Sequence, residues 1–129
     1  MQFSPNGAHV TSERDNFMVA FVDTASDPQG YLVVHRCGTE MAKELSVPAG
    51  SIYVEMNDQH LGGYGLLKSV DIESTTSWRL TLTDEAAARG LPTEISIKYV
   101  GTKALPPVIQ AAFKRLAREA GAQPAMPAA

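Results

Sequence analysis

The chain has 129 residues, of which 44% are apolar and 19% charged, a composition typical of one globular domain. The single cysteine, Cys37, excludes an intrachain disulfide, and no apolar run approaches the roughly 18 residues of a membrane-spanning helix. Residues 1–97 contain thirteen acidic side chains and six Lys and Arg, whereas residues 98–129 contain one acidic side chain and five Lys and Arg. The acidic character of residues 1–97 argues against nucleic-acid binding and suits a basic protein partner.

The first fifty residues are predicted to form strands joined by turns. A turn signal at residues 5–7 precedes a short edge strand over residues 8–12. Residues 16–22 are apolar on both faces, which predicts a central strand covered on both sides. Residues 23–30 favour a loop, and residues 31–37 form the next strand, with Tyr31, Val33, His35 and Cys37 on one face. Residues 39–45 favour one or two helical turns.

The stretch from Ser51 to Glu73 carries most of the polar chemistry of the chain. In residues 51–57 the apolar side chains alternate with Tyr53, Glu55 and Asn57, which predicts a buried face and an exposed polar face. Three glycines at residues 62, 63 and 65 predict a hairpin turn that presents Tyr64. A strand over residues 66–72 follows, with Leu66, Val70 and Ile72 facing inward. Lys68 falls on the same face, so it must lie at an edge or extend its charged end to solvent.

The remaining elements alternate between strand and helix. Residues 77–83 alternate as a strand with Trp78 inward, and Thr83 is a good N-cap for a short helix near residues 84–89 that ends at Gly90. A strand over residues 93–100 precedes a helix over residues 107–119, whose apolar face includes Val108. The pattern predicts an α+β fold, with a mostly antiparallel sheet of about six strands and the C-terminal helix on one face. We expect one domain over residues 1–120 and a loose tail over residues 121–129.

Candidate catalytic and metal-binding groups are sparse. Glu55, Asp58 and His60 could form an acid–base cluster of a small-ligand or metal-dependent enzyme, although polar residues at a strand end are more often turn formers. His35 and Cys37 share a strand face, but zinc sites need three or four ligands. We therefore expect no cofactor and no metal. A further alternative to an enzyme is a structural oligomerisation module, in which an exposed sheet edge pairs with a second copy of the chain.

The clearest functional indication is a family resemblance. Residues 53–59 read Tyr-Val-Glu-Met-Asn-Asp-Gln and are followed by Gly63-Tyr64-Gly65, and together they resemble the Imm10 family, immunity protein 10 of bacterial polymorphic toxin systems. The similarity covers about residues 16–100, including the strand with Tyr31 and the Trp78 strand. It implies a small cytoplasmic α+β protein, without catalysis, that binds and neutralises a toxin made by the same cell.

The resemblance also implies a partner surface. We expect a basic partner, often a nuclease in such systems, to meet an acidic surface that includes Glu55, Asp58, Asp71 and Glu73. The motif side chains Tyr53, Glu55, Asn57, Gln59 and Tyr64 could serve the fold instead, with Asn57 and Gln59 holding the loop. The expected partner-surface residues are Tyr53, Glu55, Asn57, Asp58, Gln59, Tyr64, Asp71 and Glu73. Neither nucleic acid nor a membrane is expected as a partner. The Met1 end lacks the basic start of a signal peptide, which fits the cytoplasm.

Overall fold

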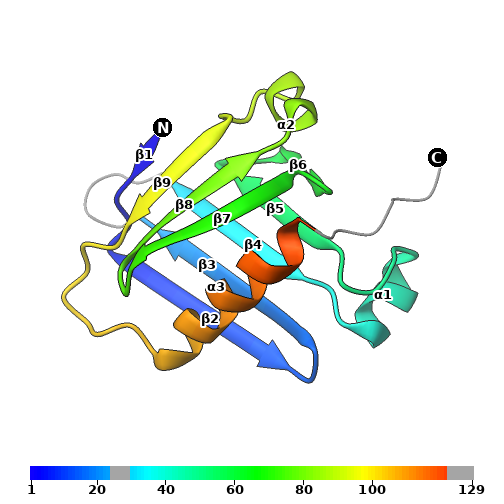
Figure 1. Ribbon diagram of the computed structural model, residues 1–129, viewed down its shortest axis with the longest axis horizontal. Coiled ribbons are helices and arrows are strands. Elements are labelled where there is room, and N and C mark those ends of the chain that lie inside the picture. Colours follow the sequence, from blue (N-terminus) through cyan, green and yellow to red (C-terminus); the bar gives the residue numbers. More distant parts are fainter. Residues whose placement is uncertain (24–29, 122–129) are drawn as a thin grey trace.

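The computed structural model describes residues 1–23 and 30–121, which fold as two β-sheets with three helices (Figure 1). The predicted α+β class is confirmed, and the strands divide between two sheets instead of forming one. Residues 24–29 of the predicted loop and residues 122–129 of the predicted tail lie outside the described residues. None of the described helices is long and apolar enough to cross a membrane.

The larger sheet has five antiparallel strands in the order β2-β3-β4-β5-β6. They are β2 (Gly7–Glu13), β3 (Asn16–Val22), β4 (Tyr31–Arg36), β5 (Ile52–Met56) and β6 (Asp58–Tyr64). Val19, Val34 and Val54 lie side by side in register and are fully buried, so the period-two alternation sets the inner face. Strand β3 is central as predicted. The prediction that both its faces are covered is wrong, because Met18 and Ala20 are half-exposed on the outer face.

The smaller sheet has four strands in the order β1-β9-β8-β7. They are β1 (Gln2–Phe3), β9 (Glu94–Lys98), β8 (Ser77–Leu82) and β7 (Leu67–Ser74), and only β1 and β9 run parallel. The alternation of β8 is confirmed. Of the three residues predicted to face inward on this last strand, Leu66, just before β7, and Val70 are buried, whereas Ile72 is 41% exposed. A register shift between Leu67 and Ser69 leaves Lys68 exposed, so its predicted place on the inward face is wrong.

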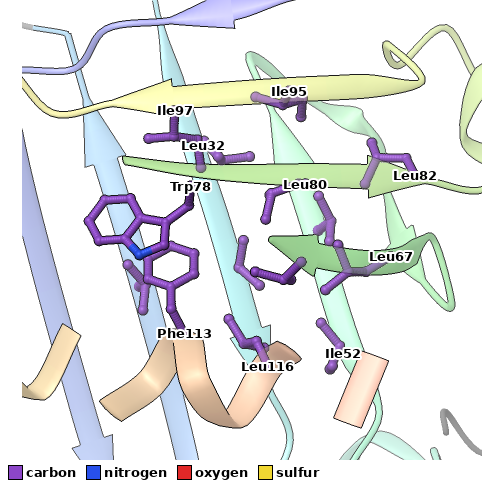
Figure 2. Packing of buried hydrophobic residues seen from close by; sticks show 14 of the residues in the cluster. Leu32, Ile52, Leu67, Trp78, Leu80, Leu82, Ile95, Ile97, Phe113 and Leu116 are labelled. Atoms are coloured by element: carbon purple, nitrogen blue, oxygen red, sulfur yellow. The ribbon is translucent and has the colours of Figure 1, made fainter. Parts of the chain in front are cut away.

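Helix α3 (Pro107–Ala120) lies beside β7 and extends the smaller sheet into a layer over the larger one (Figure 1). Figure 2 shows the core between the layers, where Trp78 and Phe113 stack with ring centroids 4.3 Å apart. The helix predicted over residues 107–119 is confirmed, and Gly121 is its C-cap. Val108, predicted to be on the apolar face, is instead 42% exposed, because it lies toward the open side of the helix near β2.

An ion pair joins α3 to the larger sheet. Arg36 on β4 is buried, and its Nε donates to the two carboxylate oxygens of Glu119 at 3.0 and 3.2 Å. Arg36 also donates through Nη1 to the Asp15 carbonyl at 2.5 Å, and Arg115 donates to Glu119 at 2.7 Å. The C-terminal turn of α3 is therefore tied to β4 by charge-assisted hydrogen bonds.

Two short helices lie at the ends of the sheets, and both were predicted. Helix α1 (Thr39–Leu45) follows β4, and helix α2 (Asp84–Ala88) follows β8. The Thr83 hydroxyl accepts a hydrogen bond from the Ala86 N–H, as expected of an N-cap, and Gly90 after the helix has φ +100°.

The predicted glycine-rich hairpin turn is wrong. Gly62 and Gly63 lie within strand β6, and only Gly65 adopts a positive φ, of 72°. The sharp turn is at Asn57, where φ is 61° and the neighbouring residues Met56 and Asp58 pair across the hairpin. Asn tolerates this left-handed conformation better than most side chains, so the turn begins earlier than the glycines suggested.

Candidate functional site

The outer face of the larger sheet carries a group of aromatic and polar side chains. The second layer packs on the inner face, so Tyr31, His35, Tyr53, Glu55 and Tyr64 are half-exposed on the opposite side. They project from three adjacent strands, because β4, β5 and β6 are neighbours in the sheet. We call Tyr31, Tyr53, Glu55 and Tyr64 the tyrosine–glutamate cluster.

Glu55 is the centre of this cluster. Tyr31 donates its hydroxyl to Oε2 of Glu55, and Tyr53 donates to Oε1, each at 2.5 Å. The hydrogen bond to Glu55 raises the pKa of Tyr31 to about 12, and burial with the same carboxylate raises the pKa of Tyr53 to about 12. Both phenols are therefore protonated donors near neutral pH, and both carboxylate oxygens are oriented by the protein.

Tyr64 extends the cluster toward the interior. Its ring centroid lies 5.3 Å from that of Tyr53, and its hydroxyl lies 3.5 Å from the buried Cys37 sulfur. Burial raises the pKa of Tyr64 well above its usual value. Tyr64 is thus a half-buried aromatic side chain that is held by contacts at both its ring and its hydroxyl.

The two strand glycines make room for this arrangement. A Cβ at Gly62 would lie 2.3 Å from the Tyr53 hydroxyl, and one at Gly63 would lie 2.7 Å from Nη1 of Arg89. Arg89, which follows α2, donates to the Gly62 carbonyl at 2.8 Å and pairs with Glu85 at 3.4 Å. The glycines serve close approach of side chains and not a turn.

Sequence reasoning missed the roles of Tyr31 and Arg89. Tyr31 was placed on the same strand face as His35, but nothing in the pattern indicated that it reaches Glu55, which is 24 residues away. Arg89 contacts Gly62 from 27 residues away. The glycine pair was the only local signal that another side chain approaches β6.

Three predicted partner-surface residues lie at the β5–β6 turn. Asn57, Asp58 and Gln59 are exposed. Asn57 exchanges two hydrogen bonds with the Tyr31 backbone, accepting through Oδ1 at 2.9 Å and donating through its N–H at 3.1 Å. Asp58 accepts from the His60 N–H at 2.9 Å. Asn57 therefore ties the turn to the start of β4.

The structure does not bring Asp71 and Glu73 together with Glu55. Both lie on β7 and point away from the larger sheet, since their neighbour Val70 faces the core between the layers. Glu73 pairs with Arg79 at 2.9 Å, and Asp71 lies opposite Arg79 in register. The eight predicted residues thus do not form one surface, because Asp71 and Glu73 lie on the smaller sheet and the other six lie on the larger sheet and its β5–β6 turn.

The alternative acid–base cluster finds little geometric support. Both carboxylate oxygens of Glu55 accept phenol hydrogen bonds, and Asp58 accepts from the backbone of His60. Among the described residues, no three His, Cys, Asp or Glu side chains are placed to share a metal ion. His35 contacts Asn16 through Nε2 at 2.9 Å, and burial lowers the pKa of His35.

Charge is distributed unevenly between the two halves of the sequence. Residues 1–66, which form β1, α1 and the larger sheet, contain eight acidic side chains and three Lys and Arg, a net charge of −5. Residues 67–129 contain six acidic side chains and eight Lys and Arg, a net charge of +2. A hollow of about 180 Å³ beside α1 is lined by Glu13, Asp15, Glu40 and Glu44 together with Arg14. Acidic side chains therefore predominate in the half of the sequence that contains the larger sheet.

Comparison with known protein families gives a match over most of the chain. A family model described as immunity protein 10 matches residues 6–104, from the start of the larger sheet to the segment before α3. No curated protein and no solved structure matches significantly.

Proposed function

The chain belongs to the immunity protein 10 family, and on that premise we propose that it binds and neutralises a cognate bacterial toxin. The proposed mechanism is occlusion without catalysis, in the cytoplasm of the cell that makes the toxin. The immunity domain would comprise residues 1–120, because α3 lies beyond the matched residues yet its Phe113 and Leu116 complete the core.

The observation that carries this proposal is the tyrosine–glutamate cluster. Tyrosines bury a large area at small entropic cost, and those of this cluster are already held by hydrogen bonds before a partner arrives. The cluster lies on the uncovered outer face of the larger sheet, over β4, β5 and β6, and tyrosine is one of the residue types that most often anchor interfaces.

The charge distribution supports a basic partner. A net charge of −5 in residues 1–66 would accelerate encounter with a basic surface and orient the complex. A nuclease toxin would present such a surface, because its substrate groove must attract phosphates. Covering that groove would exclude the nucleic acid, and the immunity protein would need no active site.

Co-expression with the product of the adjacent gene is the first test. We expect a complex that co-elutes and a cell that grows, and a toxic neighbour without complex formation would refute the proposal.

Two double variants with the same change in charge then locate the surface. Glu55→Gln with Asp58→Asn neutralises the larger-sheet side, and Asp71→Asn with Glu73→Gln neutralises the opposite side.

We expect the first double variant to weaken toxin binding by roughly ten- to hundredfold and to flatten its salt dependence. The second should bind within about twofold of the wild type, because charges remote from an interface contribute little beyond the Debye length. Isothermal titration at two salt concentrations measures both. The reverse ranking would place the toxin on the smaller sheet.

A further inference from the structure

Strand β2 forms one edge of the larger sheet, and this edge is regular. Within the described residues, β2 pairs with β3 alone, through seven consecutive register positions without a bulge (Figure 1). Edge strands usually avoid unwanted pairing through a proline, a lysine or a bulge. The residues of β2, Gly7–Glu13, include none of these.

The register identifies the backbone groups on the open side of β2. The Asp23 N–H donates to the Gly30 carbonyl at 2.9 Å, which marks a hydrogen-bonded pair between β3 and β4. Because such pairs alternate along antiparallel strands, Phe17, Val19 and Phe21 bond to β4. Their neighbours on β3 therefore bond to β2. Ala8, Val10 and Ser12 consequently direct their N–H and C=O groups away from the sheet.

Two hollows lie beneath this edge, on the inner side of the strand. Val10 and Ser12 line a hollow of about 140 Å³ that also involves Val108 and Ala111 of α3. Ala8 lines a second hollow, of about 590 Å³, together with the segment of residues 99–106. A strand added to β2 would place alternate side chains over these hollows, as in β-strand addition.

We propose that β2 pairs antiparallel with β2 of a second copy of this chain, which joins two five-stranded sheets into one. In the register centred on the two-fold axis, Val10 lies opposite Val10, and Ala8 lies opposite Ser12 of the other copy. This register uses all three residues whose backbone groups face outward. The Val10 and Ala8 side chains of the second copy then cover the hollow beside Val108.

Charge also favours a second copy as the occupant. Glu13 and the acidic hollow lie at one end of β2, and Lys103 lines the hollow at the other end. The two-fold axis brings the acidic end of each copy to the Lys103 end of its partner. This contact between opposite charges occurs twice, because both copies use the same surface in the dimer. The proposal is independent of the toxin-binding function.

The full chain should have twice its mass of 13.8 kDa in light scattering or sedimentation. Val10→Glu places two carboxylates across the axis and should give a monomer where the wild type is dimeric, and Val10→Lys should do the same. Mixing the two variants should restore a dimer, since opposite charges then face each other. Ile72→Glu, a similar change on the exposed part of β7, is the control and should stay dimeric.

Ser12→Pro is a second variant, because Ser12 is exposed and its N–H points away from β3. It should weaken the dimer at least tenfold while thermal unfolding stays cooperative. A wild type that is monomeric up to about 1 mM overturns the proposal. So does a Val10→Glu chain that dimerises like the wild type. A monomeric wild type whose Val10→Glu variant no longer binds the toxin also overturns it, and assigns the edge to the toxin.

Discussion

The pair between Arg36 and Glu119 offers a quantitative test of how α3 is held. The exposed fraction of the side chain is 11% for Arg36 and 29% for Glu119, so the pair is largely withdrawn from water. In Glu119→Ala, Arg36 remains buried with only the Asp15 carbonyl as a hydrogen-bond partner from this network. Removing one partner from a fully buried pair costs about 3–5 kcal/mol. Because Glu119 is partly exposed, we expect a loss of about 2–3 kcal/mol in the free energy of unfolding.

Urea unfolding followed by circular dichroism measures this loss, and the melting temperature should fall by roughly 8–12 °C for a domain of this size. Arg36→Met should partly rescue Glu119→Ala, because the double variant has no unpaired buried charge. Glu40→Ala is the matched control. It breaks the Arg14–Glu40 pair, whose side chains are 68% and 73% exposed, and should cost less than about 0.5 kcal/mol.

Equal losses for Glu119→Ala and Glu40→Ala would refute this reasoning, since burial would then make no difference to the pair. The reasoning would also be refuted if the double variant lost more free energy of unfolding than the two single variants lose in total. That outcome would show that Arg36 contributes mainly by packing its apolar stem and not by pairing.

Two further predictions concern the tyrosine–glutamate cluster. Gly62→Ala should lower the free energy of unfolding in urea by about 1–2 kcal/mol and weaken toxin binding, because the new Cβ would lie 2.3 Å from the Tyr53 hydroxyl. Gly121→Ala is the control and should be neutral, because a Cβ at Gly121 would have no neighbour within 4 Å. Equal stability of the two variants would contradict the packing described for β6. The raised pKa values of Tyr31 and Tyr53, both about 12, mean that the folded state holds these protons more tightly than the unfolded state. Their contribution is therefore complete below about pH 10 and is lost as the pH rises toward about 12, and Glu55→Gln should make that loss shallower in alkaline unfolding curves. A loss as steep in Glu55→Gln as in the wild type would show that the carboxylate is not its cause.

Local patterns in the sequence determined the inner face of most strands. The alternation at residues 52–56 and 78–82 predicted which side chains are buried, because a strand places successive side chains on opposite faces. Thr83 and Gly90 marked the ends of α2 through capping, which involves only a few consecutive residues. The family motif around Tyr53 and Tyr64 was equally local, and the match to the immunity protein 10 family bears it out.

Features that depend on pairing between distant strands were decided only by the tertiary structure. Alternation is the same whether a strand joins one sheet or another, so the division into two sheets was not predictable. For the same reason Asp71 and Glu73 could not be separated from Glu55 until the layers were known. Gly62 and Gly63 resembled a turn because their actual purpose, to admit Tyr53 and Arg89, involves a side chain from a distant helix end. Nearby residues thus determined burial and caps, whereas the cluster around Glu55 depends on contacts between residues far apart in the chain.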